Sequence, residues 1–240
     1  MKLQDIFDQL QYGELSHLSL GALDTPERQK QAIAHINMGL LELHKRFWLI
    51  SKNLIIYLYP HMREYLIDYR HLITNQIKPE PYQYILESVH APFKDDLLKI
   101  ESIFDNKGKE LPLNNVTLTE ANKEELSTEV SSFFTPQYNI LRVPIDYVGD
   151  VVIVQYRANH PKLSLECEPE ETEVILPPLF LEPLLLYVGH RASRILNSDT
   201  NQESNNYLQQ FELSCKNIRD WGYEIKVHNT NIKLDNSGWV

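Results

Sequence analysis

Apolar residues recur at helical spacing at both ends of this chain, whereas the middle is rich in β-branched and aromatic residues. This order differs from the repeated alternation of strand and helix that builds a parallel sheet, and the simplest packing joins the two helical ends as one discontinuous bundle. The sequence therefore predicts an α+β fold. We place the bundle at residues 1–47 and 177–222, a β-rich insertion at residues 48–176, and an extended C-terminal arm at residues 223–240.

Two helices are predicted before the insertion. Gly13 is suited to end the first helix, because glycine is common just after a helix C-terminus. Thr25 and Pro26 are suited to begin the second, because proline fits the first helical position. The apolar stripes that face the core comprise Leu3, Ile6, Phe7 and Leu10 in the first helix, and Ile33, Ile36, Leu40, Leu43 and Phe47 in the second.

Two further helices are predicted after the insertion. Pro177 and Pro178 precede the first of them, and Trp221 with Gly222 closes the second. Small residues at Gly189 and Ala192 let another backbone approach, either in the bundle core, which we favour, or in an interface between subunits. The stripes comprise Leu181, Leu184, Leu185, Val188, Ala192 and Ile195, and then Leu208, Phe211, Cys215 and Ile218.

The middle of the chain predicts strands joined by turns. Residues 53–59 and 64–73 are β-branched and aromatic, and the sequence DNKG at residues 105–108 predicts a hairpin turn. Further strands are predicted at residues 138–144 and 150–158, the second with a clear period of two. The polar stretch at residues 116–137 predicts a loop.

Charge and hydropathy restrict the function. The 33 acidic and 23 basic side chains give a formal net charge of −10, which disfavours a protein that grips nucleic acid, although not one that lets DNA slide past. The most apolar stretch, Ile175 to Gly189, contains Glu182 and three prolines and is shorter than the roughly 20 residues of a membrane span. Two distant cysteines and a polar-interrupted N-terminus favour a reducing compartment without a secretory signal.

The sequence shows no enzyme motif. GxSxG, P-loop and GxGxxG patterns are absent, and Cys215 lies on an apolar helix stripe, where it is more typical of a core residue than of a nucleophile. His35 and His44 fall on opposite helix faces, and other histidines lack ligand spacing, so we assign the histidines packing or surface roles. We predict no catalytic residue, cofactor or metal.

An acidic cluster precedes the third predicted helix. A solvated acidic loop is favoured over a divalent-cation site, because calcium loops alternate oxygen ligands more regularly and contain a glycine. The cluster comprises Glu166, Glu168, Glu170, Glu171 and Glu173.

Two groups of segments resemble a known family. Near the start stand LQYGELSHLSLG and AIAHINMGLLELHKRF; near the end stand LPPLFLEPLLLYVGHRASRIL, YLQQFELSCKNIRDWG and NTNIKLDNSGWV. Together they resemble the head-to-tail adaptors, or connectors, of tailed bacteriophages of the short-tailed type, including the tail tubular protein A-like adaptors. The resemblance spans most of the chain and is strongest at the helical ends.

The resemblance implies a structural virion protein and not an enzyme. Such adaptors have a helical bundle that carries a β insertion, and they form a cyclic homo-oligomer, usually a dodecamer, at the head-tail junction. The ring lies beneath the portal protein, contacts a tail tube or nozzle protein, and lets DNA pass without specific binding. We therefore expect a protein made in the host cytoplasm and located in the virion, with no membrane partner.

The resemblance also implies that the C-terminal arm grips the portal or a neighbouring subunit. Side chains of the arm offer hydrogen-bonding groups, charges and the aromatic anchor that interfaces favour. A frayed terminus is the alternative that polarity alone favours. The expected binding residues are Asn229, Thr230, Asn231, Lys233, Asp235, Gly238, Trp239 and Val240.

Two alternatives remain open. One is another virion component, either a head-completion protein or a tail-tube protein. The other is an acidic intracellular enzyme whose active site assembles from distant residues.

Overall fold

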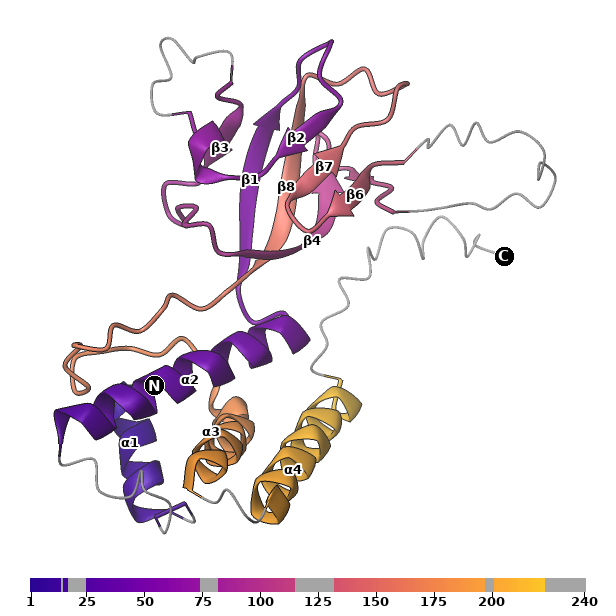
Figure 1. Ribbon diagram of the computed structural model, residues 1–240. Helices are drawn as coiled ribbons and strands as arrows, with labels where there is room; N and C mark the ends of the chain where they lie inside the picture. The colour runs from indigo at the N-terminus through magenta and orange to yellow at the C-terminus, as the bar shows by residue number, and fades with distance from the viewer. Residues whose placement is uncertain (14, 17–24, 74–81, 115–131, 197–200, 223–240) are drawn as a thin grey trace, which may run out of the picture. The chain divides into compact units, whose positions relative to one another are not determined.

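The computed structural model describes residues 1–13, 15–16, 25–73, 82–114, 132–196 and 201–222 (Figure 1). The chain has both helices and antiparallel sheets, so its class is α+β. It divides into two compact units. The helical unit comprises Met1–Trp48 with Lys162–Val240, and the β unit comprises Leu49–Pro161.

The helical unit is built from both ends of the chain. Its helices are α1 (Leu3–Tyr12), α2 (Pro26–Arg46), α3 (Leu181–Leu196), which follows the short 3₁₀ helix η3 (Pro178–Phe180), and α4 (Asn201–Asp220). The third helix, α3, packs against the other three. Helices were predicted in all four places, and the prediction is confirmed, including the start of α2 at its proline.

The core of the helical unit lies where α2 approaches α3. Phe47 meets Phe180 edge to face, with ring centroids 4.8 Å apart. Gly39 lets the two helices approach closely, because a Cβ at this position would lie 2.6 Å from Cδ1 of Leu184. Gly189 is buried against Leu15, so the small residues of α3 pack in the core, as predicted.

The segment Lys162–Leu176 belongs to the helical unit, although the sequence analysis assigned it to the insertion. The backbone N–H of Val174 donates to the carbonyl oxygen of Met1 at 2.8 Å. The Asn37 side chain on α2 accepts from the backbone N–H of Leu163 at 2.8 Å and donates to its carbonyl oxygen at 3.0 Å. These backbone contacts, which a periodicity argument does not detect, attach the segment to the helices.

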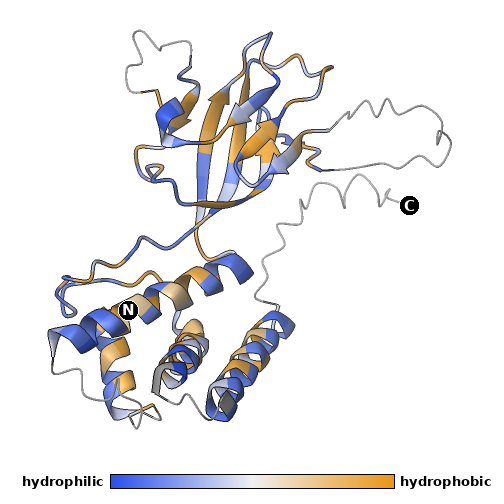
Figure 2. Cartoon of the chain, in the orientation of Figure 1, coloured by the Kyte–Doolittle hydropathy of each residue, from blue (hydrophilic) through white to orange (hydrophobic). Residues whose placement is uncertain are grey.

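The larger sheet of the β unit has the strand order β3-β1-β8-β4-β5, with antiparallel pairs throughout. Ser51 lies opposite Arg157 where β1 and β8 begin their pairing. Alternate residues of β8 are buried, as its predicted period of two requires, and Figure 2 shows how apolar residues concentrate on these strands. The strands are β1 (Ser51–Tyr57), β3 (Ile85–Glu87), β4 (Leu97–Phe104), β5 (Glu110–Leu111) and β8 (Val151–Ala158).

A smaller antiparallel sheet has the order β2-β7-β6. Its strands are β2 (Glu64–Leu66), β6 (Phe134–Gln137) and β7 (Ile140–Arg142). Residues 116–137 were predicted to form a loop, and this is wrong for β6; residues 115–131 lie outside the described part of the chain. A hairpin was predicted at DNKG and is confirmed, with Gly108 at φ +81° between β4 and β5.

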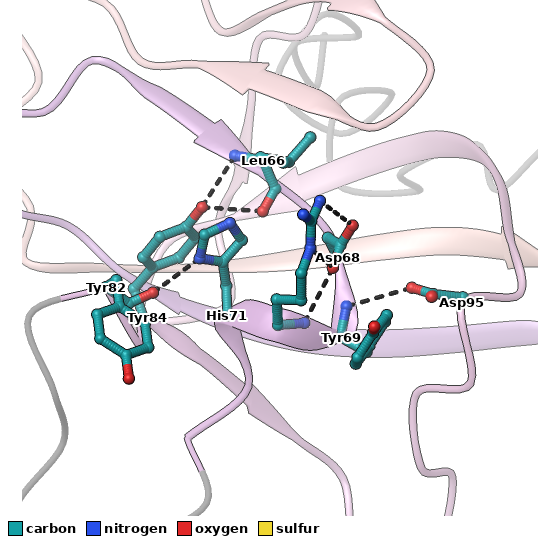
Figure 3. A network of polar contacts seen from close by, with 8 residues as sticks. Leu66, Asp68, Tyr69, His71, Tyr82, Tyr84 and Asp95 are labelled. Carbon is teal, nitrogen blue, oxygen red and sulfur yellow. Dashed lines mark hydrogen bonds and ion pairs between the residues drawn. The ribbon is translucent and has the colours of Figure 1, made fainter.

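The strand predicted at residues 64–73 is only partly correct. After β2 the chain forms a 3₁₀ turn, η2 (Tyr69–His71), because Asp68 caps it: its Oδ1 accepts from the backbone N–H of Arg70 at 2.9 Å. Asp95 accepts from the backbone N–H of Tyr69 at 3.2 Å (Figure 3). Side-chain capping of this kind competes with a strand ladder for the backbone groups.

A tyrosine hydroxyl connects this turn to the sheet (Figure 3). The buried Tyr84 hydroxyl donates to the Leu66 carbonyl oxygen at 2.9 Å and accepts from the Leu66 N–H at 3.0 Å. The His71 ring stacks on Tyr84 and places its Nδ1 2.8 Å from the carbonyl oxygen of Tyr82. The two contacts of the Tyr84 hydroxyl satisfy this buried side chain within the β unit, so we assign the network a structural role.

Candidate protein-binding groove

An apolar groove of about 640 Å³ lies on the helical unit. Residues of α1, η3, α3 and α4 line it. Its apolar lining includes Leu181, Leu185 and Leu186 of α3, and Leu213, Ile218 and Trp221 at and beyond the C-terminal half of α4.

The third helix contributes leucines to the groove because it has more of them than its core face can bury. Successive residues of a helix are about 100° apart, so Leu184 and Leu186 point to opposite sides. Leu184 is fully buried near Gly39 of α2. Leu185 and Leu186 are only partly buried, and both line the groove. The run of consecutive leucines therefore forms a second apolar surface beside the core stripe.

The fourth helix repeats this arrangement. Phe211 and Cys215 are buried, whereas Leu213, about 200° from Phe211 around the axis, is 58% exposed. Trp221 is 70% exposed at the end of the helix. Large apolar side chains that gather on one exposed face mark protein-binding surfaces, and tryptophan is a frequent anchor in them.

The end of α4 is fixed by its backbone. Gly222 has φ +78°, a conformation that glycine adopts without steric cost, and its N–H donates to the carbonyl oxygen of Arg219 at 2.8 Å. The N–H of Trp221 donates to the carbonyl oxygen of Asn217 at 3.0 Å. The backbone of Trp221 is therefore held at the edge of the groove.

Polar side chains line the groove beside the leucines. Glu182 accepts a long hydrogen bond of 3.5 Å from the Ser214 hydroxyl, and Gln9, Gln210 and Asn217 also line the groove. Amide side chains can both donate to and accept from a peptide backbone. Apolar residues with polar groups beside them suit a bound polypeptide segment rather than a small charged substrate.

An ion pair next to the groove connects α2 to α4. Arg46 donates to both carboxylate oxygens of Glu212, at 2.5 and 2.8 Å, and its guanidinium lies 4.8 Å from the centre of the Phe211 ring. The hydrogen bonds from Arg46 lower the pKa of the Glu212 carboxyl. This exposed ion pair links α2 to α4, which carries one wall of the groove.

A buried serine and histidine lie close together between α3 and α4. Nδ1 of His190 is 2.9 Å from the Ser204 hydroxyl, which is a distance suitable for a nucleophile and its base. Ser204 is only 2% exposed, however, and its hydroxyl also lies within hydrogen-bonding distance of the His190 carbonyl oxygen. The pair is enclosed in the helical core, so we assign it a packing role.

The acidic cluster before η3 is solvent-exposed, with each of its five glutamates in the exposed class. Glu166 lies 3.6 Å from Lys30. In the described ranges, no group of three or more histidine, cysteine or acidic residues is arranged to hold a metal ion. Burial raises the pKa of the Cys215 thiol to about 11, which makes it a poor nucleophile at neutral pH.

None of the helices that the structure describes is both long enough and apolar enough to cross a bilayer.

The arm residues expected from the sequence lie outside the described part of the chain: Asn229, Thr230, Asn231, Lys233, Asp235, Gly238, Trp239 and Val240. Sequence reasoning missed the groove because it assigned Leu181 and Leu185 to the core stripe and did not assign Leu213 to any site. The excess of leucines over one helical face was the signal that could have identified it.

A scan against known protein families finds no match for this chain, and a search of curated proteins finds no similar one.

Proposed function

We propose that this protein is a structural virion protein, a head-to-tail adaptor that forms a dodecameric ring beneath the portal. In this role it joins the portal to the tail and lines the channel through which DNA leaves. The apolar groove of the helical unit carries the proposal, because a surface with large exposed apolar side chains is stabilised by burial against another protein. The α+β fold, with helices from both chain ends and a separate β unit, agrees with what the sequence resemblance implies.

A closed ring requires two different surfaces on each subunit, one that meets the preceding neighbour and one that meets the next. The groove supplies one such surface. The β unit has a smaller pocket of about 520 Å³, lined in part by Tyr57, Tyr59, Gln83 and Asp150, and the exposed Val148 and Ile145 do not line it. The groove of the helical unit is larger, and its lining includes Leu213 and Trp221, which are 58% and 70% exposed. The groove is therefore the better candidate for a specific contact.

The negative charge of the chain suits a DNA channel. Each chain has a formal net charge of −10, and cyclic assembly multiplies it. Like charges repel, so a negative lining discourages DNA from adhering during passage.

The arm completes the proposal. Residues 228–240 bind the portal, with Trp239 as the aromatic anchor and the amide side chains bonding to exposed backbone. The groove and the arm then have separate tasks, the first between subunits and the second toward the portal.

Electron microscopy with the portal complex of the same virus tests this proposal. The full chain is expected to form one ring on the portal, whereas a chain without residues 228–240 stays folded and does not dock. Leu213→Glu is expected to weaken ring formation, and Val148→Glu, which changes an apolar residue of the β unit, serves as its matched control. Normal docking of the truncated chain contradicts the proposal, and open-ended tubes favour a tail-tube protein instead.

A further inference from the structure

The described part of the helical unit ends at the groove itself. Trp221 lines the groove, and the next residue, Gly222, has a left-handed backbone conformation with φ +78°. A glycine of this kind after a helix turns the chain away from the helix axis. Residues 223–240 therefore begin at the edge of an apolar groove.

These residues are long enough to cover the groove. The lining of α4 extends from Tyr207 to Trp221. At about 1.5 Å per residue in a helix and about 3.3 Å per residue in an extended chain, roughly six to seven extended residues match this length. Residues 223–240 exceed that number and leave a remainder for other contacts.

The sequence that follows Gly222 has the pattern of a segment with one apolar side. Tyr223, Ile225 and Val227 alternate with Glu224, Lys226 and His228, whereas Ile232 and Leu234 alternate in the opposite phase and do not belong to this set. In an extended chain, alternate residues point the same way. When extended, such a segment has its apolar side chains on one side, suited to a leucine-lined groove, and its polar side chains on the other.

We propose that the first residues after Gly222, with Tyr223, Ile225 and Val227 on one side, occupy the α3–α4 groove of their own chain before assembly. The chain then covers its own exposed leucines, and assembly requires the arm to leave the groove. Binding of this segment to the groove of its own chain requires neither a ring nor a portal. Assembly is the second step: the arm leaves the groove, and both the groove and the arm can then bind partners. Only this step rests on the proposed function.

This arrangement accounts for two observations together. Leu213 and Trp221 are large, apolar and exposed among the described residues, a condition that favours aggregation of an isolated chain. The segment that begins one residue after Gly222 is near enough to cover them without a second molecule. A tethered segment also binds at a high effective concentration, so modest affinity suffices.

Photo-crosslinking of the full chain tests the proposal. Benzoylphenylalanine replaces Val227, and only crosslinks to α3 or to the part of α4 near Tyr207 are counted, because connectivity to Trp221 does not force them. Isotopically light and heavy chains are mixed before irradiation, and mass spectrometry identifies the crosslinked peptides. We expect crosslinks to α3 or α4 within one chain.

Two further variants show whether the groove causes the crosslink. Leu213 is 58% exposed, so Leu213→Glu leaves the helical core intact. It is expected to lower the yield at least about fivefold, because a charge replaces an apolar contact. Val148→Glu in the β unit is expected to leave the yield unchanged, and circular dichroism confirms that both variants stay folded.

Three results overturn the proposal. Crosslinks that join only light to heavy chains show that a second copy provides the segment. Crosslinks that fall mainly in residues 49–161, or no crosslinks at all, show that the groove is not the binding site. An equal crosslinking yield in the Leu213→Glu variant and in the chain that keeps Leu213 shows that the contact is not specific for the groove. None of these results bears on portal docking, which the truncated chain tests separately.

Discussion

The two units differ in how they satisfy polar groups that folding buries. In the β unit, the Tyr65 hydroxyl accepts from the Tyr59 N–H at 2.6 Å, and the Tyr156 hydroxyl donates to Asp96 at 3.0 Å. In the helical unit, both ring nitrogens of His35 are buried and have no hydrogen-bond partner among the residues that the structure describes. These two tyrosine hydroxyls of the β unit are thus paired, whereas among the described residues the helical unit leaves a buried imidazole unpaired and a groove of leucines exposed.

The difference indicates where each unit meets other molecules. Buried hydroxyls that are paired inside the β unit need no partner molecule to satisfy them. A unit with a large apolar groove gains stability when another segment covers that groove. We therefore expect perturbations of the helical unit to affect assembly as well as stability, and perturbations of the β unit to affect stability alone.

The strongest test removes one core aromatic residue from each unit. Phe180→Ala in the helical unit and Phe133→Ala in the β unit each remove a buried ring, at a cost of about 3–5 kcal/mol in unfolding free energy. Hydrogen exchange in increasing urea reports each unit by its own peptides. Each substitution is expected to lower the unfolding free energy of its own unit. An equal loss of unfolding free energy in both units after either substitution contradicts the division into two units.

Gly39→Ala tests the contact between α2 and α3. The new Cβ would lie 2.6 Å from Cδ1 of Leu184, which is fully buried, and overpacking of this kind costs about 1–3 kcal/mol. Thermal unfolding of the helical unit is the measurement. Gly189→Ala is the control, because its Cβ would meet Leu15 at 3.0 Å, so we expect a smaller loss; an unchanged melting temperature for Gly39→Ala means that the helices separate easily.

Acidification is expected to weaken the helical unit through His35. Burial, and then the positive charge of Arg191, lowers the pKa of His35 below its usual 6.5. The unfolded chain therefore takes up a proton at a higher pH than the folded chain does, and stability falls as the pH decreases below about 6.5. One such group changes the unfolding free energy by at most about 1.4 kcal/mol per pH unit.

Urea titrations at several pH values measure this effect. His35→Phe is expected to reduce the pH dependence of the helical unit. His160 of the β unit supplies the comparison: burial lowers its pKa too, but its Nδ1 lies 2.6 Å from the Pro161 carbonyl oxygen, which opposes the shift. An equal pH dependence before and after His35→Phe would show that His35 is not the responsible group.

Tyr84→Phe is expected to have the smallest effect. The change removes one hydroxyl that bonds to both the N–H and the carbonyl oxygen of Leu66, at a cost of about 1 kcal/mol in the β unit. Amide exchange at Leu66 should accelerate. Tyr82→Phe is the control, because that side chain is 53% exposed, and equal effects of the two substitutions would argue against the hydroxyl contact.

The helices were the most predictable part of the fold. Their apolar residues follow the helical period, and Pro26 and Gly13 mark a start and an end in the sequence itself. The short strands were harder to predict. The three residues of β3 are too few to show a period, and the capping by Asp68 that ends the predicted second strand depends on side-chain geometry.

The candidate site was less predictable than the fold. Periodicity shows which side of a helix is apolar, but it does not show which apolar residues a neighbour covers, so Leu185 was assigned to the core although it lines the groove. The role of Trp239 came from the family resemblance and remains a prediction, because this residue lies outside the described part of the chain.

The β unit begins and ends in two neighbouring strands, β1 and β8. Ser51 lies opposite Arg157, and the Ala158 N–H donates to the Ile50 carbonyl oxygen at 3.0 Å. Its ends are thus adjacent, as in an inserted cassette. A short flexible linker could replace residues 49–161 and join the helical segments directly, and the excised unit could be transplanted into a surface loop of an unrelated scaffold. Evolution could exchange such a module without rebuilding the helices that flank it.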